Sequence, residues 1–147
     1  MKKKVAQKLP HLQVIGRREY IGLPDFDVED IVAKVDTGAY RTVIHCLSCR
    51  EIEEGVTRLL EAEFDLDEKG VHRHTFEEYT MKEVRSSFGR SETRYCVRTR
   101  LRIGKKEIRT EVTLTDRSEM SCQVLIGRKT LTRRFIVDVS KNFVLGK

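Results

Sequence analysis

Apolar and polar residues alternate along most of this chain, which is the pattern of half-buried β-strands. Turn-forming residues at 22–25, 67–70 and 104–106 separate several of the alternating segments. The expected strands are 14–21, 31–35, 60–66, 97–103, 108–114, 135–139 and 143–145. A period of two therefore predicts a mainly β protein.

Two stretches depart from this alternation. Residues 128–134 favour a short helix, and residues 71–91 are polar and less regular. Several short strands followed by one late helix suggest a small closed β-barrel. The chain has 147 residues, enough for one domain with its own core. We expect that domain over residues 13–147, after a flexible basic tail over residues 1–12.

The chain is highly charged and basic. Charged residues make up 35% of it, and the net charge is +6. This favours acidic partners, such as nucleic acid, an anionic surface or an acidic polypeptide, without choosing among them. No apolar run approaches the ~20 residues that span a bilayer, and the basic start lacks an uninterrupted apolar region. With four cysteines expected as reduced thiols, we predict a cytoplasmic protein that does not cross a membrane.

The most informative feature is Asp36-Thr37-Gly38, directly after the apolar strand 31–35. An aspartic peptidase presents its catalytic carboxylate in this way. The strand fixes the aspartate backbone, the threonine hydroxyl can hydrogen-bond within the turn, and glycine lets backbone N–H groups approach the carboxylate. The later run 124–128, Val-Leu-Ile-Gly-Arg, is typical of the segment that packs beneath this loop in retroviral-type aspartic peptidases. The ordered pair predicts Asp36 as a catalytic residue.

The chain contains one Asp-Thr-Gly and no Asp-Ser-Gly. Acid–base peptide hydrolysis of this kind needs two carboxylates close enough to share a proton. A twofold homodimer would supply the pair by placing Asp36 of each subunit across the axis. Asp116 and Asp138 are alternatives within one subunit. They rank below the dimer, and Asp138 is followed by Val139 rather than by a Thr-Gly turn.

Further motifs follow one another in order along nearly the whole chain. They are the runs 15–20, 33–39, 44–46, 84–87, 95–99, 113–117, 125–128 and 135–139. On these motifs the chain resembles the retropepsin-like aspartic endopeptidase family of bacteria and archaea, often catalogued as ATP-dependent zinc proteases. The resemblance implies an acid-protease-like barrel that works as a homodimer, with Asp36 catalytic and with Thr37 and Gly38 holding the catalytic loop.

The resemblance also implies where and what the protein binds. The substrate-binding positions are Ala39 and the segment Arg85, Ser86 and Ser87, in or beside a flap-like hairpin. Family members are associated with ATP-grasp ligases that append glutamates to proteins, so an acidic or glutamate-tailed polypeptide is the implied substrate. Arg41 departs from the small hydroxyl residue that is usual there. The alternative left open is a catalytically silent β-barrel module that binds an acidic protein or nucleic acid.

The zinc in the family's label directs attention to His45, Cys46 and Cys49, with His72 and His74 downstream. Two thiolates and two imidazoles can hold a structural zinc ion. However, there is no second Cys-x-x-Cys, no His-Glu-x-x-His and no phosphate-binding loop with Lys-Ser/Thr. We therefore expect ordinary thiols, no metal, no cofactor and no ATP dependence. Adjacent strand residues point to opposite faces, which argues against a nucleophilic Cys46 activated by His45.

Three arginines alternate along the expected strand 97–103, at positions 98, 100 and 102. We expect them to pair with Glu107 and Glu111 on the neighbouring strand, where such pairs contribute only tenths of a kcal/mol. The alternative is an electrostatic guide for an acidic substrate.

Overall fold

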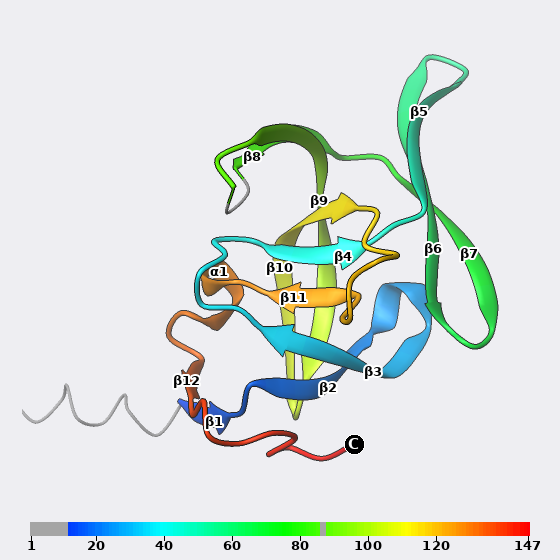
Figure 1. Cartoon of the computed structure of the whole chain (residues 1–147). Helices are drawn as coiled ribbons and strands as arrows, with labels where there is room; N and C mark the ends of the chain where they lie inside the picture. The colour runs from blue at the N-terminus through cyan, green and yellow to red at the C-terminus, as the bar shows by residue number, and fades with distance from the viewer. Residues whose placement is uncertain (1–11, 86–87) are drawn as a thin grey trace, which may run out of the picture.

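The computed structural model describes residues 12–85 and 88–147, and Figure 1 shows their arrangement. The strands are β1 (Gln13–Ile15), β2 (Arg18–Leu23), β3 (Val28–Val35), β4 (Thr42–His45), β5 (Ser48–Glu54), β6 (Thr57–Asp67), β7 (Gly70–Phe76), β8 (Thr80–Arg85), β9 (Ser91–Ile103), β10 (Lys106–Thr115), β11 (Val124–Ile126) and β12 (Phe135–Val137). The 3-10 helix η2 (Pro24–Phe26) and the helix α1 (Arg128–Leu131) join some of them. In the described ranges, no helix has the length and apolar character needed to cross a membrane.

The main sheet closes into a barrel because its two ends meet. Its strands follow the order β10-β4-β11-β3-β2-β9, and β9 also pairs with β10, so six strands of the described chain form a ring. Strand β8 lies outside this ring and pairs antiparallel with β9, with which it forms a hairpin. The mainly β fold with a small closed barrel and one short late helix is confirmed.

Alternating side chains of the barrel strands point inward and form the core. Each strand of the ring contributes at least one fully or almost fully buried apolar residue; examples are Ile21, Ala33, Ile44, Leu101, Val112 and Ile126. Burying one such aliphatic side chain contributes about 1.5–3 kcal/mol, so the alternation seen in the sequence drives barrel closure.

A three-stranded antiparallel sheet, β5-β6-β7, stands beside the barrel (Figure 1). It packs through Phe64 and Phe76 against Phe26, whose ring stacks on Phe64 with centroids 4.5 Å apart. The prediction that residues 71–91 are irregular is wrong, because this stretch contains most of β7, all of β8 and the first residue of β9. Both faces of β7 and β8 are rich in exposed polar residues, so pairing with neighbours decides their conformation rather than their own hydrophobic pattern.

The two ends of the described chain meet beside β2. The expected single strand 14–21 is divided into β1 and β2 because the C-terminal segment passes there. A Cβ on Gly16 would lie 2.3 Å from the carbonyl oxygen of Lys141, and Arg17 N–H donates to that same oxygen at 2.7 Å. The expected strand at 143–145 is wrong. That segment is held instead by the buried carboxylate of Glu19, which accepts hydrogen bonds from the N–H groups of Val144 and Leu145.

Candidate active site

Asp36 follows β3 directly and is held by backbone hydrogen bonds on both sides. Its N–H donates to the carbonyl of Ile126 at 2.9 Å, and the N–H of Gly38 donates to its Oδ1 at 3.0 Å. A Cβ on Gly38 would lie 3.3 Å from that oxygen, a tight contact that glycine avoids. Asp36 is half-buried, whereas Thr37 and Gly38 are exposed. The loop therefore presents an oriented carboxylate to solvent.

The run 124–128 packs beneath this loop as its floor, the position that such a run has in retroviral-type aspartic peptidases. The N–H of Arg128 donates to the carbonyl of Ala39 at 2.8 Å, and the Arg128 side chain donates to the carbonyl of Thr37 at 3.0 Å. Gly127 is required because a Cβ there would lie 2.5 Å from the backbone carbonyl of Arg41. Residues separated by about ninety positions thus lock the conformation of the Asp36 loop.

Buried hydroxyl groups tie this floor to the barrel wall. Thr42 Oγ1 accepts a hydrogen bond from the N–H of Gly127 at 3.1 Å and lies 2.7 Å from Thr130 Oγ1. Thr130 Oγ1 in turn lies 3.2 Å from Thr110 Oγ1 on β10. Each of these three threonines is buried, so the chain of hydroxyls fixes α1 against β4 and β10.

A cluster of cations surrounds Tyr40, the residue that leaves the Asp36 loop. Arg41 Cζ, Arg128 Cζ and Lys129 Nζ lie 5.1, 5.7 and 5.9 Å from the centroid of its ring. Glu111 neutralises part of this charge through Lys129 at 2.6 Å and Arg41 at 3.3 Å. The hydrogen bond from Lys129 is the main reason that the pKa of Glu111 lies below its ordinary value. The surroundings of the loop are therefore basic.

Neither alternative carboxylate makes a hydrogen bond or an ion pair with Asp36 in the described ranges. Asp116 lies beyond the end of β10, where Thr115 pairs with His45, whereas the Asp36 loop lies at the opposite end of β4. Its carboxylate accepts from the Ser118 side chain at 2.5 Å, which lowers the pKa of Asp116. Asp138 accepts from Ser140 in a similar turn. Both side chains are engaged locally.

The flap-like segment expected around residue 85 corresponds to the hairpin of β8 and β9. Arg85 ends β8 and pairs in register with Ser91, while Ser86 and Ser87 lie outside the described residues. In Figure 1 this hairpin projects toward the side of the barrel that carries α1 and the loop between β3 and β4. Ala39 lies half-buried in the Asp36 loop.

The expected arginine pairs formed in part. Arg100 pairs with Glu107 at 3.2 Å but also with Asp25 at 2.7 Å, and Arg102 pairs with Glu107 at 3.4 Å. Glu111 was expected to pair with the same stripe, and this was wrong. It pairs instead with Arg41, which precedes the neighbouring strand β4, and with Lys129 of α1.

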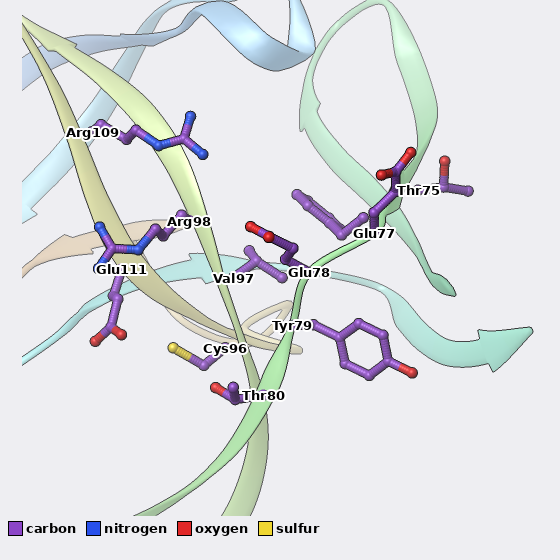
Figure 2. A pocket seen from close by; sticks show the side chains of 11 residues that line it. Thr75, Glu77, Glu78, Tyr79, Thr80, Cys96, Val97, Arg98, Arg109 and Glu111 are labelled. Carbon is purple, nitrogen blue, oxygen red and sulfur yellow. The ribbon is translucent and has the colours of Figure 1, made fainter. Parts of the chain in front are cut away.

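Arg98 and Arg109 instead line a cavity of ≈330 Å³ beside β9 and β10. Figure 2 shows the linker that carries Glu77, Glu78 and Tyr79 on the other side of this cavity. Acidic and basic groups therefore both line its wall.

The three histidines among the candidate metal ligands do not converge on one site. His45 is buried, and its Nδ1 accepts the backbone N–H of Arg117 at 2.8 Å. His72 faces Asp67 at 3.4 Å within the β6–β7 hairpin. His74 packs against Phe26 and Phe76, and burial lowers its pKa. Among the described residues, no group of three or more His, Cys, Asp or Glu side chains is placed to hold a metal ion.

Sequence reasoning did not assign a role to Arg117, although it lies in one of the quoted motifs. Its side chain donates to the carbonyl of Cys122 at 3.0 Å and is partly buried. Burial and the nearby Arg94 lower the pKa of Arg117, while the carboxylate of Asp36 acts in the opposite direction. Arg117 is therefore a cation within electrostatic range of Asp36, and only the folded chain brings the two together.

Comparison with known proteins adds independent information. A family model described as RimB-like, retropepsin-like aspartic endopeptidase RimB, matches residues 14–147. A crystal structure of a Legionella pneumophila protein of unknown function is similar, with a TM-score of 0.74 and 25% identity; the match covers 90% of this chain and 98% of that one.

Curated relatives carry a different name. A probable alpha-L-glutamate ligase of Desulfotalea psychrophila is 29% identical over 138 residues, which cover 92% of this chain and 30% of that protein. A protein of the same name from Shewanella pealeana is 31% identical over 140 residues, which cover 91% and 30%. This chain spans about 30% of the length of these relatives.

Proposed function

We propose, because this chain belongs to the RimB-like family of retropepsin-like aspartic endopeptidases, that it cleaves peptide bonds with Asp36 as a catalytic residue. The observation that carries the proposal is the Asp36 loop. A carboxylate at the end of a buried strand is oriented by the N–H of Gly38 at 3.0 Å, and it faces solvent beside exposed Thr37. This is an arrangement in which a carboxylate can activate a water molecule as a general base.

The second carboxylate comes, in this proposal, from another copy of the chain. One Asp36 would remove a proton from water, and its mate would protonate the scissile carbonyl or the leaving amide. Two features support a homodimer. Thr37 and Gly38 of the Asp36 loop are exposed. On the same side of the barrel in Figure 1, β1 and β12 carry Val14 and Ile136, which are 40% and 51% exposed. A second copy would cover these apolar side chains while bringing the two aspartates together.

The basic surroundings favour an acidic polypeptide substrate, such as a glutamate-tailed protein. A hollow of ≈620 Å³ opens beside the loop, and its lining consists of Tyr40, Lys129, Thr132, Arg133 and Arg134. A cation-lined hollow attracts glutamate side chains and rejects cationic peptides. Ala39, Arg85, Ser86 and Ser87 are the further proposed substrate contacts. We expect Arg133→Gln to raise KM for a glutamate-tailed substrate several-fold while leaving kcat almost unchanged.

The relatives' names support a functional link to an enzyme that adds glutamate. They are called probable alpha-L-glutamate ligases, and this chain matches about 30% of their length. A peptidase for glutamate tails would act on the product of such a ligase. All four cysteines are free thiols, which fits the cytoplasm, where thiols are kept reduced.

The test is cleavage of a protein carrying a glutamate tail, read by mass spectrometry, with the same protein carrying a glutamine tail as control substrate. Wild type, Asp36→Asn and the matched variant Asp30→Asn, which changes an exposed carboxylate on β3, are compared with and without a metal chelator. We expect chelator-resistant cleavage that only Asp36→Asn abolishes. Cleavage lost to the chelator alone would overturn the aspartic mechanism.

The dimer has its own test. Wild type is unfolded and refolded together with an increasing excess of Asp36→Asn protein. If each site uses one Asp36 from each subunit, mixed dimers are inactive and activity per wild-type chain falls toward zero. Activity independent of the added variant would refute the homodimer while leaving the role of Asp36 intact.

A second candidate is a catalytically silent module that binds an acidic protein or nucleic acid. The names of the relatives favour it, because a third of a ligase can serve to hold the glutamate-tailed product rather than to cleave it. Retention of the glutamate-tailed protein or of nucleic acid by both wild type and Asp36→Asn, with no cleavage by either, would favour this candidate. Cleavage by wild type excludes it.

A further inference from the structure

Two cysteines meet at the end of β4 opposite to the Asp36 loop. Cys46 follows β4 directly, and Cys49 lies near the start of β5. Their Sγ atoms are 3.0 Å apart, and Cys46 also contacts the carbonyl of Ser48 at 3.0 Å. Cys46 is 2% exposed, whereas Cys49 is half-buried. This pair has no part in the chemistry proposed for Asp36.

The backbone already holds the two sulfurs in position for a covalent bond. The N–H of Cys46 donates to the carbonyl of Thr115 at 2.9 Å, and the N–H of Leu47 donates to the carbonyl of Glu63 at 2.8 Å. Cys49 is fixed by its pairing with Ala62 in the β5–β6 ladder. Sulfurs of a disulfide are about 2.05 Å apart, so these two need to approach by only about 1 Å.

The two thiols differ in acidity. The hydrogen bond from Cys49 lowers the pKa of Cys46, with further help from the backbone around Ser48 and Glu63, although burial and Asp116 oppose it. The same contact, together with burial, raises the pKa of Cys49. Cys46 is thus the more acidic of the two thiols and forms the thiolate more readily than Cys49. A thiolate is the nucleophilic form of cysteine.

A small cavity leads to the pair. Its volume is ≈180 Å³, and its lining includes Cys46, Cys49, Arg94, Tyr95 and Asp116. A cavity of this volume has room for a molecule as small as hydrogen peroxide. The ion pair between Arg94 and Glu92, at 2.7 Å, lies at the same cavity. The cavity therefore gives a small oxidant access to the two sulfurs.

We propose that Cys46 and Cys49 form a reversible dithiol site that small hydroperoxides oxidise to an intramolecular disulfide. The Cys46 thiolate attacks one oxygen of the peroxide, the O–O bond breaks, and Cys46 becomes a sulfenic acid while the other oxygen leaves as hydroxide or alkoxide. The Cys49 sulfur then attacks Cys46 Sγ and expels the hydroxyl group, which takes the Cys49 proton and leaves as water. With hydrogen peroxide the balance is two thiols and one peroxide giving one disulfide and two waters.

The other two cysteines serve as internal controls. Cys96 and Cys122 are 3% and 6% exposed, and burial raises the pKa of Cys96. Among the described residues, neither contacts another cysteine sulfur. We therefore expect them to stay reduced under conditions that oxidise the pair.

The test is differential alkylation of the whole reduced protein after brief exposure to hydrogen peroxide. Free thiols are blocked with one reagent, disulfides are reduced and then blocked with a second, and peptides are assigned by mass spectrometry. We expect the second label on Cys46 and Cys49 together, and its loss when dithiothreitol is added before blocking. Equal labelling of all four cysteines, or a pair that remains reduced, would overturn the proposal.

Two single variants test the order of events. Cys49→Ser removes the second thiol, so Cys46 is expected to accumulate as a sulfenic acid that dimedone traps. Cys46→Ser is expected to leave Cys49 unreactive, and Cys122→Ser to behave like wild type. Because the wild-type protein alone reports the disulfide, a variant that fails to fold does not decide the result. Dimedone labelling of Cys49 in Cys46→Ser, at the rate seen for Cys46 in Cys49→Ser, would show that the assigned nucleophile is wrong.

Discussion

Glu19 is the residue whose replacement most directly tests how the two ends of the described chain are held together. Its carboxylate is fully buried and accepts three backbone hydrogen bonds, from Gly16 at 2.7 Å, Val144 at 3.0 Å and Leu145 at 3.1 Å. We predict that both Glu19→Gln and Glu19→Leu destabilise the fold, and that Glu19→Leu does so more strongly. The glutamine variant keeps one carbonyl oxygen, whereas the leucine variant keeps no acceptor.

The magnitude follows from these contacts. A hydrogen bond to a charged group contributes about 1.5–3 kcal/mol net, and Glu19→Gln loses at least one, so we expect a cost of about 2 kcal/mol. Glu19→Leu loses all three, but release of the C-terminal segment lets water solvate the N–H groups of Val144 and Leu145. The cost is then limited to about 3–5 kcal/mol. That is a large part of the 5–15 kcal/mol typical of a domain.

Equilibrium unfolding in urea measures both costs, with the exposed Glu119→Gln as a control expected to change stability by no more than about 0.5 kcal/mol. Hydrogen exchange of residues 141–145 shows whether the segment has detached. A Glu19→Leu protein as stable as the control, with unchanged protection of that segment, would refute the assigned clamp. A graded loss with increased exchange in the segment would support it.

Three further predictions concern the loop floor and the barrel wall. Thr42→Val removes the acceptor for the N–H of Gly127, so we expect a loss of about 1–3 kcal/mol in urea unfolding and lower activity. In Gly127→Ala, the backbone of Arg41 must move away from a Cβ at 2.5 Å. The variant should unfold at a lower temperature than wild type, and at temperatures where it is still folded its activity should be reduced. Burial raises the pKa of Asp25, but hydrogen bonds from Arg100 and Thr99 outweigh it and hold that pKa below its ordinary value. The stabilisation is therefore present at neutral pH and lost as pH falls through the folded-state pKa. The stability difference between wild type and Asp25→Asn should shrink below about pH 4, and a constant difference down to pH 2 would contradict this.

The sequence indicated the barrel and the position of Asp36 because both depend on local order. Alternation along 31–35 and 97–103 reports which face of a strand is buried, and a strand followed by Asp-Thr-Gly specifies a turn. Strand β9 extends over 91–103, and β3 ends at Val35, immediately before Asp36. These features required no knowledge of distant partners.

Strands β5, β7 and β8 were not visible in the sequence. Their burial patterns are dominated by exposed and half-buried positions, so no continuous apolar face distinguishes them from loops. They are strands because β6 and β9 offer their backbone groups as partners. Edge strands of this kind gain most of their stability from the ladder rather than from their own side chains.

The sequence by itself determined the fold class, the candidate catalytic residue Asp36 and the run 124–128 that packs beneath its loop. Hydrophobic periodicity and turn-forming residues can be recognised from residues that are neighbours in the sequence. Only the tertiary structure decided that Glu111 forms ion pairs with Arg41 and Lys129. The same holds for the cavity that Cys46 and Cys49 share, and for the hydrogen bonds by which Glu19 holds a segment 125 positions away. Such contacts depend on how whole strands are ordered in the barrel. A charged side chain pairs with whichever group the fold brings within a few ångströms, and sequence distance carries no information about that.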